Sequence, residues 1–170
     1  MTEAGQSRPP LSDLAIVQNP GLGAFALWRF GQGFQAEDER PAPFALAFLL
    51  LPIVLHRATL DIVTSTNRPS GLALFAAKLG KEREQLLAVH ERALLLRALT
   101  LQSVAVGVSG HLLSVDYKDA TLRANTPEPK PKKLVLPERV KHLGPASEKL
   151  GFWFSKLGTT QVANLLRVEF

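Results

Sequence analysis

The sequence predicts a mainly α-helical protein that contains one short β-hairpin. Along most of the chain, apolar residues recur at helical spacing between residues that typically start or end helices. Only residues 112–124 change to a strand-like pattern, in which two short apolar runs flank a polar turn. We therefore expect a helical domain that includes a hairpin and is followed by a helical C-terminal tail.

The composition indicates an ordinary globular protein without any site built on cysteine. Of 170 residues, 46% are hydrophobic and 21% are charged, and Cys does not occur. The length is sufficient for a hydrophobic core, so the fold requires neither a metal nor a disulfide. The lack of Cys excludes disulfides, thiol catalysis and Cys-zinc sites, and it fits the reducing cytoplasm, where we expect the protein to be located.

No segment predicts secretion or insertion into a membrane. The first ten residues are polar and lack the apolar stretch of a signal peptide. The most apolar run, residues 44–55, is shorter than the roughly 20 residues that span a bilayer, and it contains Pro52. We expect this run to be a buried helix, with a buried strand as the alternative, and we expect no membrane partner.

Helix-capping residues divide the first half of the chain. Asn19 followed by Pro20 is typical of a helix start and predicts a helix over residues 20–34. Further helices are expected over residues 44–55, 56–67 and 71–79.

Residues 81–125 have the element order of a winged helix-turn-helix unit. An amphipathic helix is expected over residues 81–99, a second helix starts at Thr100 and stops at Gly110, and the hairpin would be the wing. No Gly or Pro marks the break between the helices near Thr100, so one long helix fits the pattern as well.

We interpret the chain as one domain with a linker and a docked tail. The helical domain covers residues 1–125, the linker is the Pro- and Lys-rich segment 126–136, and residues 137–170 form helices docked on the same domain. The end of the chain is too apolar for a free tail, so we expect Phe170 to be docked.

Basic charge is concentrated in the tail. Residues 1–125 contain 12 Lys and Arg against 11 Asp and Glu, whereas residues 126–170 contain 8 against 4, so the net charges are +1 and +4. A basic tail suits nucleic acid, an acidic protein or anionic lipid, and it is equally a common way to keep a protein soluble.

Few residues are suited to contact DNA. A recognition helix over residues 101–110 would offer Gln102 but no Arg or Lys, which is poor for reading bases. This favours a scaffold for protein contacts, with a winged-helix DNA-binding protein or transcriptional regulator acting on its own as the alternative. The candidate DNA contacts from helix, wing and linker are Gln102, Lys118, Arg123, Lys130, Lys132 and Lys133.

The sequence contains no catalytic or metal-binding pattern. None of the four His residues forms an HxH, HExxH or HxxxH pair, and GxSxG, GxGxxG and GxxxxGK motifs do not occur. We therefore expect no catalytic, cofactor-binding or metal site, and no enzymatic activity.

Short motifs in a characteristic order cover nearly the whole chain. They are residues 19–24 (NPGLGA) with Trp28 and Phe34, then 51–56 (LPIVLH), 70–72 (SGL), 91–94 (ERAL), 110–113 (GHLL), 149–151 (KLG) with Trp153 and Phe154, and 165–170 (LLRVEF). In this order the chain resembles the middle component of three-component ABC ATPase systems, a family of small bacterial proteins.

The resemblance implies a non-enzymatic adaptor in a bacterial antiviral or anti-plasmid defence complex. In such systems an SMC-like ABC ATPase is expected to act as the sensor and motor. A separate effector, often a nuclease, is expected to attack the target. The middle component would join these two partners and meet nucleic acid through the complex. As candidate partner interface we single out Trp28, Phe30, Phe34, Trp153 and Phe154.

Overall fold

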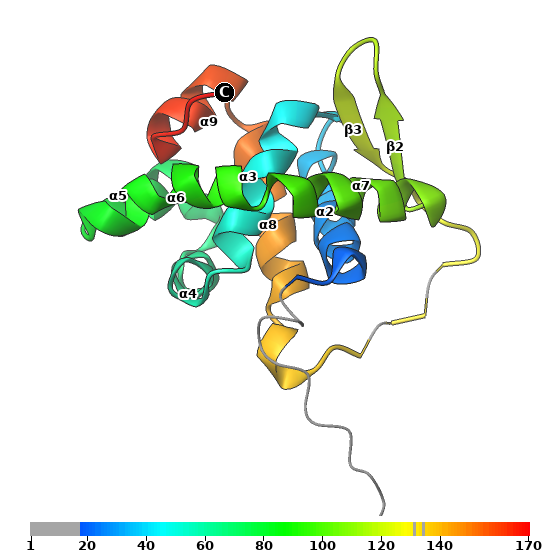
Figure 1. Cartoon of the computed structure of the whole chain (residues 1–170), viewed down its shortest axis with the longest axis horizontal. Coiled ribbons are helices and arrows are strands. Elements are labelled where there is room, and N and C mark those ends of the chain that lie inside the picture. The colour runs from blue at the N-terminus through cyan, green and yellow to red at the C-terminus, as the bar shows by residue number, and fades with distance from the viewer. Residues whose placement is uncertain (1–17, 131, 134) are drawn as a thin grey trace, which may run out of the picture.

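Helix α2 (Pro20–Phe34) lies in the middle of the molecule beside a helix from the far end of the chain (Figure 1). The structure is a computed structural model that describes residues 18–130, 132–133 and 135–170. Helix α2 begins as predicted, because Asn19 Oδ1 accepts hydrogen bonds from the backbone N–H groups of Gly21 at 2.8 Å and Leu22 at 3.4 Å. These bonds satisfy two of the donors that a helix start leaves free.

Helix α2 packs against α8 (Leu143–Ser155) with the two backbones in contact. A Cβ on Gly33 would lie 2.7 Å from the carbonyl carbon of Glu148, and a Cβ on Gly151 would lie 2.9 Å from that of Phe30. The helices can approach so closely only because both positions are glycine. Close packing thus accounts for glycines that otherwise lower the stability of a helix.

The apolar run predicted as a buried helix is α3 (Phe44–Val54). Leu49, Leu50 and Leu51 are fully buried, so the helix is covered on several sides. Pro52 lies inside α3, which ends two residues later, and the next helix, α4 (Arg57–Ser65), is bent away from it by 102°.

The described fold has four further helical elements outside residues 83–124. They are the 3-10 turn Arg68–Ser70, α5 (Gly71–Gly80), the 3-10 turn Glu138–Val140 and α9 (Thr159–Leu166). The prediction that Phe170 is docked was wrong, since 64% of this residue is exposed. Val168 is buried instead, because the left-handed backbone of Arg167 (φ 56°) turns the chain back onto α9, where Val168 N–H donates to Ala163 O at 3.0 Å.

Two separate helices precede the hairpin. Helices α6 (Arg83–Leu95) and α7 (Arg97–Ser109) meet at Leu96, earlier in the chain than the predicted break, and are bent by 60°. The two helices of a helix-turn-helix meet at about 90–120° and are joined by a turn of three to four residues, whereas only Leu96 separates α6 from α7. The order of helix, helix and hairpin is as expected, while the assignment as a winged helix stays a prediction.

The predicted hairpin is present as β2 (Leu113–Asp116) and β3 (Thr121–Ala124). A third strand, β1 (Ala42–Pro43), pairs antiparallel with the free side of β3, which gives the sheet order β1-β3-β2. Sequence reasoning missed β1 because a strand of two residues, one of them a proline, is too short to show the alternation of a strand.

Within the described residues, no single helix has the length and hydrophobicity needed to cross a membrane. The bent pairs α3–α4 and α6–α7 have the required length and hydrophobicity only when the two helices of each pair are counted together.

The contact between α2 and α8 generates a stability prediction. Gly33→Ala should lower the free energy of unfolding by about 1–3 kcal/mol or more, since backbone cannot give way as a flexible side chain can. Gly80→Ala is the control, because its Cβ would lie 3.6 Å from Leu86, an ordinary contact. Chemical denaturation measures both, and equal stability of the two variants would contradict backbone contact at Gly33.

Candidate interaction surfaces

The side chains predicted as a partner interface are mostly part of the core. Phe30, Phe34, Trp153 and Phe154 are each at most 2% exposed. The Phe30 and Phe154 rings meet edge to face with centroids 5.6 Å apart, and Trp153 Nε1 donates to Arg68 O at 2.8 Å. For these four residues the prediction was wrong. The close approach of α2 and α8 buries Phe30 against Phe154, and Trp153 packs on Phe75 of α5 with ring centroids 5.8 Å apart.

Trp28 differs from the other four aromatic residues because it is only half-buried. Its Nε1 donates to Asn125 O at 2.8 Å, which ties α2 to the end of the hairpin. The rest of the ring lines a groove described below.

Large apolar side chains are exposed along the outer side of α6 and α7. In Figure 1 these two helices run across the front of the molecule. Between 39% and 81% of each side chain in this set is exposed. We call the set the α6–α7 face, and it consists of Leu87, Leu94, Leu95, Leu101, Val106 and Val108.

The inner side of α7 is closely packed. Ser103 is fully buried and packs so closely on α2 that a Cβ on Gly23 would lie 2.8 Å from Ser103 Cβ. A Cβ on Gly107 would lie 2.9 Å from Leu113 Cγ. At these two positions the inner side has room only for small residues, although Leu99 and Val104 are buried nearby on the same side. Leu101, Val106 and Val108 lie on the outer side instead.

The α7 part of this face is also poor in charge, because Arg97, the first residue of α7, is the only ionisable residue of that helix. On α6, by contrast, exposed Glu91 lies one helical turn from Leu87 and from Leu94. A surface helix normally has charged and polar residues on its solvent side. Exposed apolar side chains combined with few charges are characteristic of the core of protein–protein interfaces.

Sequence reasoning did not single out this face, although a signal was present. Residues 93–108 contain one charged residue, Arg97, in a stretch long enough for four turns of helix. The pattern shows that α7 is apolar all round, but it cannot show which side lies against the core.

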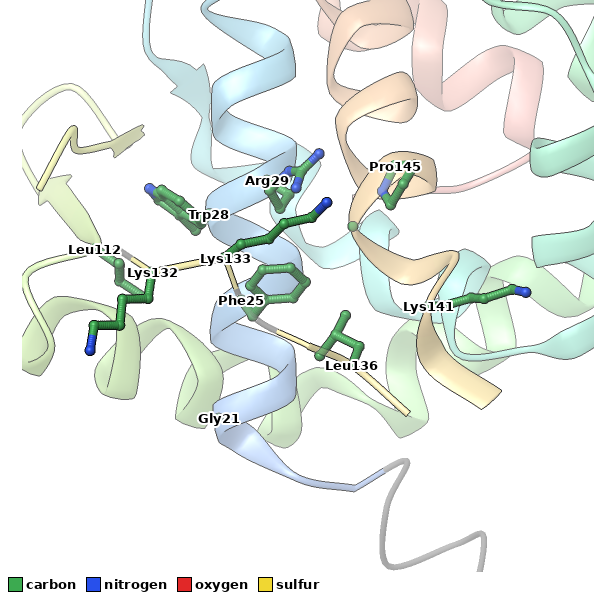
Figure 2. Close-up of a pocket in the computed structure, with 11 residues that line it drawn as sticks. Gly21, Phe25, Trp28, Arg29, Leu112, Lys132, Lys133, Leu136, Lys141 and Pro145 are labelled. Atoms are coloured by element: carbon green, nitrogen blue, oxygen red, sulfur yellow. The ribbon is translucent and has the colours of Figure 1, made fainter. Parts of the chain in front are cut away.

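A groove of about 570 Å³ lies beside α2, between α8 and the lining residues Lys132, Lys133, Leu136 and Lys141 (Figure 2). Its lining includes two aromatic residues and four basic ones and, within the described part of the chain, no acidic residue; they are Phe25, Trp28, Arg29, Lys132, Lys133 and Lys141. Two of the cations are paired outside the lining: Arg29 Nη2 lies 2.6 Å from Glu148 Oε2, and Lys141 pairs with Glu138.

The structure distributes the predicted DNA contacts over separate places. Gln102 is exposed on α7, among the apolar side chains of the α6–α7 face. Lys130 follows the hairpin, and only Lys132 and Lys133 reach the lining of the groove.

The two hairpin residues have different surroundings. Lys118 lies in the tight turn, where Asp116 Oδ1 accepts the backbone N–H groups of Lys118 and Asp119 at 2.9 and 3.1 Å. The carboxylate of Asp116 therefore weakens the attraction of the turn for phosphate. Arg123 Nη1 donates to the backbone carbonyl oxygen of Glu39 at 2.9 Å, so part of its guanidinium is already engaged within the protein.

Comparison with known proteins identifies the family. Residues 8–170 match the model of the family described as ABC-three component (ABC-3C) system Middle Component 3. The chain belongs to this family. The resemblance inferred from the motif order is thereby confirmed. No curated protein matches the chain, and no solved structure does.

Three basic groups of this middle component have pKa values lowered by burial. Arg92 Nε donates to Pro52 O at 3.0 Å, at the end of α3, and burial lowers the pKa of Arg92. Burial, and after it the positive charge of Arg92, lowers the pKa of His56.

Lys149 lies in a comparable position at the end of α4. Its Nζ donates to the carbonyl oxygens of Val63 at 3.0 Å and Thr66 at 2.9 Å, while burial and the charge of Lys78 lower its pKa. Cations at helix C-termini satisfy free carbonyl groups and oppose the helix dipole, so both Arg92 and Lys149 stabilise the fold.

The lowered pKa of His56 predicts a pH dependence of stability. The unfolded chain takes up the proton near pH 6.5, whereas folded His56 resists it. The stability that neutral His56 contributes is therefore complete above that pH and is lost as the pH falls through the lowered value. His56→Gln should reduce the decrease in melting temperature between neutral and mildly acidic pH, and an unchanged decrease would contradict this role.

The exposure of the α6–α7 face predicts that it is dispensable for folding. Replacing Leu94, Leu95 and Leu101 by Gln should change the free energy of unfolding by no more than about 0.5 kcal/mol per site, and binding of a hydrophobic dye should decrease. Leu50→Ala, at a fully buried position, should cost about 2–5 kcal/mol as the control. Unfolding of the triple variant would show that the face is part of the core.

Proposed function

We propose that this protein is a non-enzymatic adaptor that joins the ABC ATPase of its system to an effector. Membership of the Middle Component 3 family supports a role beside the other components of a three-component system. The observation that carries the binding role is the α6–α7 face, where large apolar side chains are exposed and α7 has no ionisable residue after Arg97.

The energetics of this face favour a protein partner. Complete burial of a Leu or Val side chain contributes about 1.5–3 kcal/mol. Association costs an estimated 4–15 kcal/mol in lost freedom of motion, so several such side chains have to be buried together. Six of them lie on two consecutive helices of this chain, and the three on α7 have no ionisable residue of that helix beside them after Arg97.

The finer parts of the proposal rest on the motif resemblance. On this proposal the ATPase is SMC-like, the effector is a nuclease, and the complex acts in the cytoplasm against phage or plasmids. Nucleic acid would then be a partner of the assembled complex.

The alternative of a winged-helix regulator is less well supported. Its recognition helix would be α7, and the outer side of α7 presents Leu101, Val106 and Val108. Readers of base edges carry Arg, Lys, Asn or Gln at such positions, and α7 offers only Gln102 among these after Arg97.

Co-expression with the other two components of its own system tests the adaptor role. A tagged wild-type chain should retain both components on an affinity column. The variant with Leu94, Leu95 and Leu101 all changed to Gln should lose at least one of them, because the apolar contact is removed while the fold persists.

A matched control separates the face from general surface polarity. Leu74, Val135 and Phe170 are exposed apolar residues outside the α6–α7 face, and changing all three to Gln should leave co-purification intact. Retention of both components by the face variant would refute the proposed surface. Failure of the wild-type chain to retain either component would refute the adaptor role itself.

A further inference from the structure

The basic groove beside α2 is a second candidate binding surface. It is lined from α2 and α8 and by Lys132, Lys133, Leu136 and Lys141, and it shares no residue with the α6–α7 face. Its volume of about 570 Å³ lies in the range of about 300–1,000 Å³ typical of small-ligand sites. The chemistry of the two surfaces also differs, since one is mainly apolar and the other is cationic.

The charge of the groove favours an anion. Four cations line it, and the two acids paired with Arg29 and Lys141 leave a surplus of two positive charges, which corresponds to Lys132 and Lys133. Figure 2 shows the Lys132 and Lys133 side chains extending in opposite directions along the groove. An ammonium group at a concave site attracts phosphate more strongly than a lysine on a convex surface, because the concave wall concentrates its field.

The aromatic residues indicate what the anion is attached to. Phe25 and Trp28 are both half-buried, with ring centroids 6.3 Å apart, and both line the groove. Figure 2 shows Phe25 and Lys133 together on one side of α2. Cations that follow a backbone beside aromatic rings that stack on bases are the combination used to bind single-stranded nucleic acid.

We propose that this groove binds a nucleotide unit, with its phosphate on Lys133 or Lys132 and its base against Phe25. The unit comes either from a single strand or from a free nucleotide, since both offer a phosphate joined to a flat base. Of the candidate nucleic-acid contacts, these two lysines are the ones that the fold places beside aromatic rings.

Binding of fluorescein-labelled oligothymidylate and of fluorescent AMP to the isolated full-length chain tests the proposal by anisotropy. The K132E/K133E variant should bind at least tenfold more weakly than wild type. For the strand, the slope of log Kd against log salt should fall by about 1.4, at about 0.7 for each lost phosphate contact. Binding of the strand but not of AMP identifies the strand as the source, and tight AMP binding identifies the free nucleotide.

Two control variants make the result specific to the groove. K81E/K118E removes the same charge at two exposed sites outside the groove and should change Kd by less than twofold. Phe25→Leu keeps an apolar side chain but removes the ring. It should weaken binding of the base-bearing probe about fivefold or more and leave competition by tripolyphosphate unchanged.

Three outcomes would overturn the proposal. Equal weakening by K81E/K118E would show general attraction to a basic protein. An unchanged Kd for Phe25→Leu would remove the base from the site, and no binding of either probe at low salt would remove the site altogether. Because the measurement uses the chain without its partners, these outcomes are independent of whether the α6–α7 face binds the ATPase or the effector.

Discussion

The contact between the backbones of α2 and α8 is the constraint on which the rest of the structure depends. Gly33 and Gly151 allow two helices that are far apart in the sequence to touch. Phe30, Phe34 and Phe154 on these helices are buried. Helix α2 also holds the hairpin, because the side chain of its C-cap residue Gln35 donates to Ala124 O at 3.1 Å and accepts from Ala124 N at 2.7 Å. The sheet is therefore placed by α2 as well as by its own strands.

A similar constraint acts on another side of α2. Because α7 contacts α2 through Ser103 opposite Gly23, a bulky residue has no room at this point of the contact. Leu99 and Val104 are buried beside it, whereas Leu101, Val106 and Val108 lie outside. An ordinary amphipathic helix buries its large apolar residues and exposes its charges. Here α7 has apolar residues on both sides, and its outer side is left as an exposed apolar surface.

Local signals in the sequence predicted the elements, and tertiary packing decided their roles. Asn19 and Pro20 mark the start of α2 through contacts within a few residues, so the prediction of that helix was confirmed. Whether Trp153 is an interface or a core residue depends on Phe75 of α5 and on the Arg68 carbonyl, about 80 residues away in the sequence, and no local pattern encodes these contacts. The two-residue strand β1 exists only because β3 pairs with it, and the burial of Val168 instead of Phe170 depends on the backbone reversal at Arg167.

Helix α2 joins the two candidate surfaces and limits how they can communicate. One side of it supports α7 beneath the α6–α7 face, and another side supplies Phe25 and Trp28 to the groove. A conformational signal between them would require α2 to shift, yet a shift toward α8 or α7 meets backbone or side-chain atoms already in contact at Gly33 and Gly23. Coupling between sites needs an element with two arrangements of similar energy. A rigid α2 instead favours an adaptor that holds its partners at a fixed distance and orientation. Binding at one surface then fixes where that partner lies relative to the other surface, without changing the conformation of the other surface.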